Sequence, residues 1–259
     1  MSLKDEQRAH VLKALHADLR YDGRKKESFR KVIVEYDISK SAEGSARVKI
    51  GDTEVLAGVK VAIETPYPDT PEQGSLMVNA ELLPLSSARF EPGPPSTEAV
   101  ELARVVDRGI RESAAIDTKK LCIAKGEKVW MVMIDICTIN DAGNLIDASS
   151  LASLAALKQA RFPEYDGKKI DFMTKTKNPI PLLKEPIAIT VFKIEDQLFV
   201  DPLRDEEDVM DARLTVTTTA DGKICALQKG GNGILTIEDI DAMTQLAMEK
   251  SEELREKLE

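Results

Sequence analysis

The chain has 259 residues, of which 42% are hydrophobic and 31% charged, and it carries a formal net charge of −9 at pH 7. A chain of this length can bury a substantial core, and its acidity argues against a protein that coats nucleic acid or anionic membranes without specificity. No apolar run reaches the roughly 18 residues that a membrane span needs, and the charged N-terminus lacks the apolar stretch of a signal peptide, so we expect a cytoplasmic protein with no membrane contact.

The first half of the chain predicts strands enclosed by helices. In order, we expect a helix over residues 3–19, strands over 32–38, 46–50, 53–63 and 76–83, a helix beginning near 97, a long strand over 129–139 and a helix running to about residue 160. Gly51-Asp52 joins two of these strands in a hairpin. The segment 92–95 is rich in proline and breaks the chain, and Ser96 or Thr97 then caps the next helix.

The second half repeats this order more briefly after a looser stretch over residues 162–184. We expect one hairpin over 187–200 and another over 213–228, followed by a long helix that Thr236 opens with Asp239 at the reciprocal capping position. Each half therefore runs from strands and hairpins to a helix. That order favours a duplicated α+β unit that shares one core.

One helix in the first half gathers three arginines. Arg104, Arg108 and Arg111 follow one another at spacings of four and three, so the helix presents all three on one side. The other side carries residues that we expect to be buried, namely Leu102, Ala103, Val106 and Ile110. A guanidinium group suits phosphate because its paired donors match the phosphate oxygens. The pattern indicates a local anion site on an otherwise acidic protein.

A second interpretation of this arginine face stays open. Acidic residues stand three or four positions from the arginines, namely Glu101, Asp107 and Glu112. Pairs at these spacings stabilise an exposed helix by roughly 0.2–0.5 kcal/mol each. The same side can therefore be a solvated face whose charges are paired within the helix.

The sequence predicts no metal and no other cofactor. Cys122, Cys137 and Cys225 share no close spacing and lie in apolar stretches, so we expect reduced thiols in the core. His10 and His16 stand six residues apart, outside any zinc motif, and they argue against a histidine-based nucleophilic triad.

Two further segments have simple interpretations. The glycine-rich segment 230–233 precedes a helix, as a phosphate-binding loop does, but no lysine follows its last glycine. We therefore predict a turn from hairpin to helix there. The basic cluster Arg24-Lys25-Lys26 is interpreted as solvated charge.

Several motifs, taken in order, resemble the RNase PH family. Arg20-Tyr21-Asp22-Gly23-Arg24 with Phe29-Arg30 is similar to its N-terminal signature, the hairpin 46–63 to its first sheet element, and the helix 101–113 to its phosphate-contacting arginine helix. The resemblance covers roughly residues 20–250. It implies an α+β protein with the duplicated ribosomal protein S5 domain 2-like (RNase PH) fold, in which mixed sheets pack with helices. It also implies ring-shaped hexamers and phosphorolysis of RNA from its 3′ end to nucleoside diphosphates.

The same resemblance divides the chain. We expect a single RNase PH-like domain over residues 1–259, with an N-terminal unit over 30–163 and a C-terminal unit over 186–252.

The phosphate-binding loop departs from the family pattern. Active members have Ala-Gly followed by a small residue, an arginine and a hydroxyl residue. Here Ala142-Gly143 is followed by Asn144, Leu145 and Ile146, so a leucine stands where the arginine is expected. Asp147 adds a negative charge close by, which opposes binding of a multiply charged anion.

The catalytic strand departs as well. Active members carry an acidic cluster and then an Asp-Met that opens a strand, whereas here residues 204–208 are followed by Asp211-Ala212-Arg213-Leu214-Thr215. The expected acid falls on Arg213 or Leu214. Asp208 is a candidate structural acid, and Asp211 can replace the missing acid only if the strand shifts its register. We therefore expect no catalytic residue in this chain.

These departures resemble one branch of the family, the non-catalytic RNase PH-like subunit of the archaeal exosome. That resemblance implies a hexameric ring, a trimer of heterodimers in which this chain alternates with a catalytic paralogue, together with RNA-binding cap subunits and an RNA substrate. It assigns RNA binding to Arg104, Arg108 and Arg111, of which Arg111 can instead be held by Asp107. Arg89 is a further candidate for facing RNA.

Two alternatives remain open at this point. One is an active phosphorolytic 3′–5′ exoribonuclease of the RNase PH type. The other is a purely structural ring component that makes no RNA contact.

Overall fold

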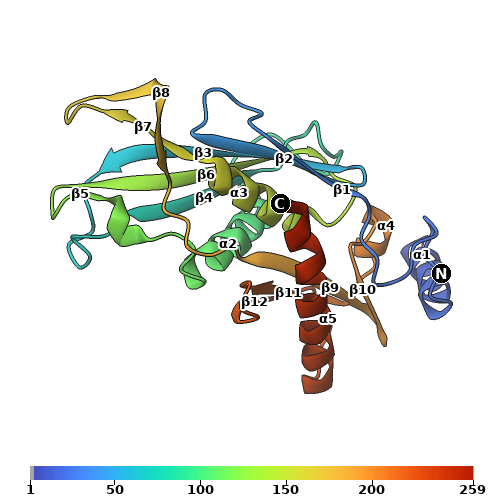
Figure 1. The fold of residues 1–259 in the computed structure, drawn as a ribbon. Coiled ribbons are helices and arrows are strands. Elements are labelled where there is room, and N and C mark those ends of the chain that lie inside the picture. Colours follow the sequence, from blue (N-terminus) through green and yellow to red (C-terminus); the bar gives the residue numbers. More distant parts are fainter. Residues whose placement is uncertain (1–2, 259) are drawn as a thin grey trace.

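Two β-sheets and the helices packed on them make up most of residues 3–258, the part of the chain that the computed structural model describes (Figure 1). The first sheet has the strand order β1-β2-β3-β6-β4, and β5 pairs with β6 at one end. Its strands are β1 (Val32–Tyr36), β2 (Gly44–Ile50), β3 (Thr53–Glu64), β4 (Ser75–Glu81), β5 (Cys122–Ala124) and β6 (Lys128–Asn140).

The parallel pairing of β4 with β6 decides where the arginine helix lies. Two parallel neighbours need a crossover connection, and α2 (Thr97–Glu112) lies in it, followed by the short helix η1 (Thr118–Leu121). The crossover lays α2 across one face of the first sheet, where α3 (Leu145–Gln159) packs on β2 and β3.

The second sheet has the strand order β10-β9-β11-β12 and is antiparallel throughout. Its elements are β9 (Ile187–Ile194), β10 (Gln197–Val200), the short helix α4 (Arg204–Glu207), β11 (Ala212–Thr218) and β12 (Ile224–Gly230). The helix α5 (Ile237–Arg255) packs on β9 and β11, and η2 (Glu256–Leu258) follows it.

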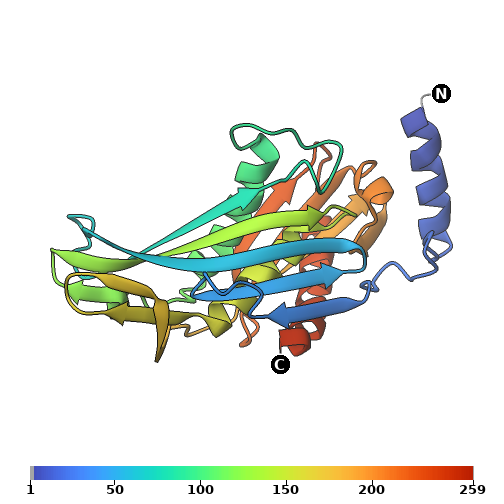
Figure 2. The same ribbon diagram turned by 90° about the horizontal axis from the view of Figure 1, so that it is seen from above.

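Helices α2 and α3 lie between the two sheets, and α5 lies on the other face of the second sheet (Figure 1). A single cluster of buried apolar residues includes side chains from both sheets and all three of these helices. A smaller cluster joins α1 (Leu3–His16) to the second sheet through Val11, Leu15 and Phe192. Figure 2 shows α1 standing beside the rest of the chain at one end. This is the α+β arrangement that the sequence predicts.

The predicted turns and caps are confirmed. Ile50 pairs with Thr53 across Gly51-Asp52, so the hairpin lies where the sequence places it. Thr236 and Asp239 form the reciprocal capping box at the start of α5.

The prediction of a looser stretch over residues 162–184 is wrong. Strands β7 (Arg161–Tyr165) and β8 (Ile170–Pro179) form a two-stranded hairpin there. The turn contains Asp166-Gly167, with Gly167 at a φ of +92°. An Asp-Gly pair is a strong hairpin signal, but irregular register in this hairpin hides the alternation of its strands.

Two smaller expectations need correction. Helix α1 ends at His16 instead of residue 19, because Asp18 adopts a φ of +50° and Leu19 N–H donates to the carbonyl of Ala14. The three cysteines are free, as expected, but they are half-buried and lie outside the core. Among the described residues, no helix combines the length and apolarity that a membrane crossing requires.

Candidate anion-binding site

Helix α2 is fixed at its start and along one side, which leaves its arginine side in solvent. Ser96 Oγ accepts the N–H of Ala99 at 3.2 Å and caps the helix. A Cβ added at Gly109 would lie 3.2 Å from the Thr217 side chain, so the helix sits close against β11. The predicted apolar side is buried at Leu102, Val106 and Ile110, while Ala103 is half-buried.

Arg104, Arg108 and Arg111 are all exposed, but their partners differ. Arg111 is paired with Asp107 at 2.6 Å and donates to the carbonyl of Leu76 at 3.0 Å. Arg108 donates only to the neutral amide oxygen of Gln228, at 3.0 Å. Within residues 3–258, Arg104 has no ion pair and no side-chain hydrogen bond. The interpretation of a face paired within the helix therefore holds for Arg111 and fails for Arg104 and Arg108.

Of the two acids that stand three residues from Arg104, Asp107 is paired with Arg111 and Glu101 is held by another part of the chain. Arg213, at the start of β11, forms an ion pair with Glu101 at 2.8 Å. The Arg213 guanidinium lies where a Cβ of Gly230 would be, at 2.5 Å, so only glycine there leaves room for it. This brace from β11 to α2 holds Glu101 away from Arg104.

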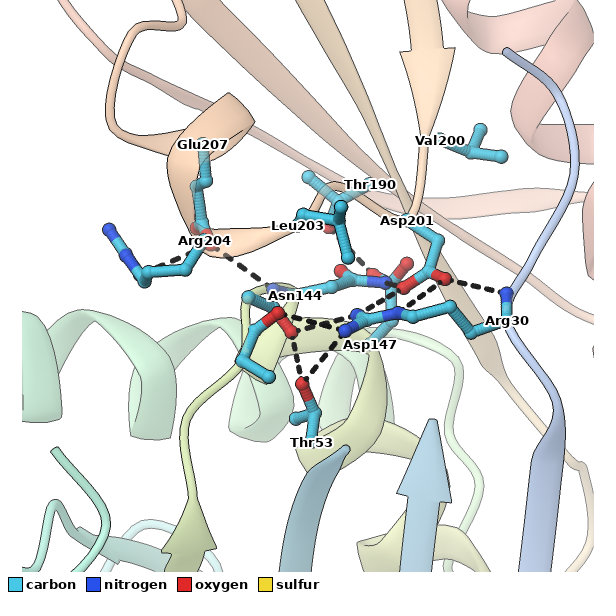
Figure 3. A network of polar contacts seen from close by, with 12 residues as sticks. Arg30, Thr53, Asn144, Asp147, Thr190, Val200, Asp201, Leu203, Arg204 and Glu207 are labelled. Atoms are coloured by element: carbon cyan, nitrogen blue, oxygen red, sulfur yellow. Dashed lines mark hydrogen bonds and ion pairs between the residues drawn. The ribbon is translucent and has the colours of Figure 1, made fainter. Parts of the chain in front are cut away.

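The start of α3 holds its own anion (Figure 3). Asn144 occupies the cap position with a φ of +62° and makes no side-chain cap, and its backbone N–H donates to Glu207 Oε2 at 3.1 Å. Arg204 donates to the same oxygen at 3.2 Å. Partial burial raises the pKa of Glu207, while the charge of Arg204 opposes that rise. A carboxylate of the chain itself thus lies where helix donors can receive a phosphate.

A buried charged group fixes this loop from the other side. Asp201 is fully buried and accepts bonds from Arg30 at 2.7 Å and from the side-chain amide of Asn144 at 3.0 Å (Figure 3). It also accepts a bond from Arg24 at 2.9 Å. Arg30 also donates to the carbonyl of Ala142 at 2.8 Å. A buried carboxylate needs such pairing, and removing one partner of such a pair typically costs about 3–5 kcal/mol. The loop is therefore a rigid structural joint.

The residues that replace the family's phosphate ligands point into the protein. Leu145 is buried. Asp147 is fully buried and accepts a hydrogen bond from Thr190 at 2.7 Å, and Thr190 is 2.9 Å from Thr215. Burial raises the pKa of Asp147 to about 7. The expectation that Asp147 repels an anion at the loop surface is corrected, because its carboxyl faces β9 in the core.

The start of β11 offers no free carboxylate. Leu214 is buried, and Arg213 is engaged with Glu101. Asp208 pairs with Arg204, as expected of a structural acid. Asp211 is held by Arg8 of α1 at 2.9 Å, so it does not take the place of the missing acid.

Two further arginines that the sequence singles out, Arg89 and Arg24, have acidic partners within the chain. Arg89 pairs with Asp141 at 2.9 Å and with Glu98 at 3.4 Å. The interpretation of Arg24 as solvated charge is wrong, because Asp201 is one of its partners. The glycine-rich segment 230–233 is the predicted turn from hairpin to helix. No group of three or more His, Cys, Asp or Glu side chains in the described part of the chain could hold a metal ion.

Sequence reasoning missed the contacts that join distant segments. Glu207 was recognised only as part of an acidic run, and no local pattern indicates that it reaches the start of α3. Gln228 carries no local signal either, since it meets Arg108 only through the packing of β12 beside α2. The sequence did draw attention to Arg24 and Arg30, which converge on Asp201.

The chain matches known proteins over nearly its whole length. The family described as 3′ exoribonuclease family, domain 1, matches residues 28–163, and domain 2 of the same family, RNase PH, matches residues 184–250. Exosome complex component Rrp42 of Methanocella arvoryzae is 49% identical over 240 residues, which are 93% of this chain and 90% of that protein.

Two solved structures have the same fold as this chain. A chain of an Archaeoglobus fulgidus exosome with RNA bound to the active site aligns with a TM-score of 0.91 at 44% identity, covering 99% of both chains. A chain of an archaeal exosome core aligns with a TM-score of 0.86 at 41% identity, covering 99% of this chain and 97% of that one.

Proposed function

The chain belongs to the RNase PH family of 3′ exoribonucleases, and from this premise we propose that it is the non-catalytic ring subunit of an archaeal exosome, a complex that degrades RNA from the 3′ end by phosphorolysis. Its partner in the ring is a catalytic RNase PH-like paralogue, which alternates with it in a trimer of heterodimers. RNA-binding cap subunits complete the assembly, which works in the cytoplasm. Relatives at 42–49% identity are named as components of that complex.

One observation carries the proposal. The same chain exposes Arg104 and Arg108 without carboxylate partners, and fills the start of α3 with its own Glu207. The strand that carries the acid in active members begins here at Ala212 and has Arg213 and Leu214 as its next residues. A chain that keeps cations for RNA while lacking the phosphate site and the catalytic acid fits a subunit that serves a neighbour's chemistry.

The arginines act by holding RNA, and the paralogue supplies the reacting groups. Two guanidinium groups one helical turn apart can bind successive phosphates and fix the strand near the bond that breaks. The amide oxygen of Gln228 orients the Arg108 guanidinium without neutralising its charge, so this group stays available to a phosphate. We assign RNA binding first to Arg104 and Arg108, and only secondarily to Arg111, whose charge Asp107 already balances.

The division into units follows from the same proposal. We place the N-terminal RNase PH unit at residues 30–163 and the C-terminal unit at 186–252, joined by residues 164–185, which include most of the β7–β8 hairpin. The network around Asp201 would then tie one unit to the other, because Arg30 and Asn144 belong to the first and Asp201 to the second.

Reconstitution tests the proposal. The pure chain, the pure paralogue and their complex are given RNA and inorganic phosphate, and nucleoside diphosphates are measured. We expect no product from this chain alone, slow turnover with weak RNA binding by the paralogue alone, and full activity from the complex. Phosphorolysis by the pure chain would instead establish the active exoribonuclease. Full activity and unchanged RNA affinity of the paralogue alone would establish a purely structural role.

A further inference from the structure

The hairpin β7–β8 is a basic element on an acidic protein. Residues 161–179 contain five basic and three acidic residues, in a chain whose net charge is −9. Figure 1 shows the hairpin rising from the first sheet at the end opposite α1. Its strands pair with each other and join neither large sheet.

Aromatic contacts hold the base of the hairpin. Trp130 of β6 lies 5.4 Å from the Phe162 ring and 5.8 Å from the Tyr165 ring, measured between centroids. Lys128 donates to the Tyr165 hydroxyl at 3.2 Å, and the Lys60 ammonium lies 4.8 Å from the Phe172 ring. The hairpin is therefore an anchored arm, and binding to it would cost little ordering.

Two of the three acids of the hairpin, Asp166 and Asp171, bond to its backbone, and the third, Glu164, is exposed. Asp166 accepts the backbone N–H groups of Lys168 and Lys169 at 2.8 and 2.7 Å and shapes the turn. Asp171 accepts the backbone N–H of Met173 at 2.9 Å. These hydrogen bonds lower the pKa of both carboxyls. The acids stay charged, but they are fixed to the backbone and leave the lysine side chains unpaired.

Four exposed lysine side chains of the hairpin have no ion pair and no side-chain hydrogen bond anywhere in residues 3–258, namely Lys168, Lys169, Lys175 and Lys177. Thr176 donates inward to the carbonyl of Phe162 at 2.8 Å, so its neighbours Lys175 and Lys177 point outward. Two residues of a strand span about 7 Å, which places two free ammonium groups in a row along β8.

We propose that this arm is a second RNA contact, which holds the single-stranded part of the substrate away from the arginine helix. The inference rests on the proposed function, because it takes RNA as the ligand. Lysine is depleted at the centres of protein interfaces and aromatic residues are enriched there, whereas flexible ammonium groups suit a phosphate backbone read without sequence preference. The most exposed apolar side chain of the arm is Met173, at 92% exposure, and its neighbour Phe172 lies against the Lys60 ammonium.

Two RNAs of different length test the proposal in the assembled ring. The short one has a few nucleotides and reaches only the arginine helix, and the long one is unstructured and has several tens. Lys175→Ala with Lys177→Ala should weaken binding of the long RNA by roughly tenfold at low salt, lower its salt slope by roughly 0.7 per lost contact, and leave the short RNA unchanged. Lys4→Ala with Lys13→Ala on α1 makes the same charge change at the opposite end and should alter neither.

A photo-crosslinker in place of Met173 identifies the occupant directly. A crosslink to the long RNA supports the proposal. A crosslink to another subunit in its place, unchanged long-RNA binding in the lysine variant, or an equal loss in the α1 control would each overturn it. Failure of the proposed function gives a different result, because the short RNA would then not depend on Arg104 and Arg108.

Discussion

The arginine side of α2 and the start of α3 can both attract an anion, and they differ in where the counter-charge comes from. On α2, Arg104 has no partner within the described residues and Arg108 has a neutral one. At the start of α3, the chain supplies Glu207 to the Asn144 N–H and Arg204 to Glu207. The first place is open to a ligand, and the second is closed by the protein itself.

Under the proposed function, this difference separates a lost anion site, which the protein fills itself, from a retained one. Leu145 offers no cation to this loop, and Glu207 also accepts the backbone N–H of Asn144 at the start of the helix. A retained site is recognised by the opposite arrangement. Arg213 binds Glu101, and the acid that could neutralise Arg104 is removed from it.

The largest effect on RNA affinity should come from the arginine side of α2. Arg104→Ala with Arg108→Ala should weaken RNA binding by the assembled ring roughly 100-fold or more, because each charge-assisted hydrogen bond contributes about 1.5–3 kcal/mol. The salt slope should fall by roughly 0.7 per lost contact with single-stranded RNA. Filter binding or fluorescence anisotropy at several salt concentrations measures both.

Arg111→Ala is the matched control for that double variant. It removes an exposed guanidinium from the same side of the same helix, but one that Asp107 already holds. We expect a small loss of affinity for Arg111→Ala and unchanged unfolding temperatures for all variants, since exposed ion pairs contribute roughly 0–1 kcal/mol. Equal losses for Arg111→Ala and the double variant would erase the distinction among the three arginines.

At the start of α3, the buried Asp147 should make the free energy of unfolding depend on pH. Burial raises the pKa of its carboxyl from an ordinary 3.8 to about 7, and its Oδ2 has no hydrogen-bond partner among the described residues. Between these two values the folded protein holds a proton that the unfolded chain has released. The free energy of unfolding therefore falls by at most ~4 kcal/mol as pH rises from about 4 to 7, since one pKa unit corresponds to about 1.4 kcal/mol. Above pH 7 this contribution no longer changes.

Asp147→Asn separates this effect from other titrations. The variant carries no ionisable group there, so its stability relative to the natural chain should rise between pH 5 and pH 8. Denaturant unfolding at several pH values measures the difference. A difference between the two chains that stays constant with pH would mean that Asp147 does not titrate in this window.

Local patterns in the sequence account for most of the secondary structure. Hydrophobic alternation predicts the strands on both sides of Gly51-Asp52, and side-chain chemistry predicts the caps at Ser96 and Thr236. Each of these depends on residues close in the chain. The arginine side of α2 is predictable from local sequence as well, because helix geometry alone aligns its three side chains.

Contacts between distant segments could not be predicted in this way. Nothing near Glu207 indicates the Asn144 N–H, and nothing near Arg213 indicates Glu101, because the packing of α2 and α3 against the second sheet brings them together. The β7–β8 hairpin is not predicted for another reason. Its Asp166-Gly167 turn is a clear signal, but shifts in the pairing register disturb the alternation of its strands.

A moderate effect on stability should follow from removing the Glu207 carboxylate from the start of α3. Glu207→Ala leaves the Asn144 N–H without its acceptor and should cost about 1–3 kcal/mol of unfolding free energy, whereas Glu207→Gln keeps an acceptor oxygen and should cost less. Denaturant unfolding at neutral pH ranks the two. Neither variant should form nucleoside diphosphates, because β11 still carries Arg213 and Leu214 where an acid is needed. Phosphorolysis by Glu207→Ala would mean that this glutamate alone had silenced the subunit.

The smallest effect on RNA affinity should come from breaking the ion pair between Arg213 of β11 and Glu101 of α2. Arg213→Met keeps an unbranched side chain but releases Glu101, which stands one helical turn before Arg104 and can then pair with it. Such a pair contributes roughly 0.2–0.5 kcal/mol, so RNA affinity of the assembled ring should fall about twofold. Adding Glu101→Gln removes the competing carboxylate and should restore the affinity, although the brace is still absent. If affinity stayed low in the double variant, Arg213 would matter for the packing of α2 and not for the charge of Arg104, and the open place would owe its freedom to the helix alone.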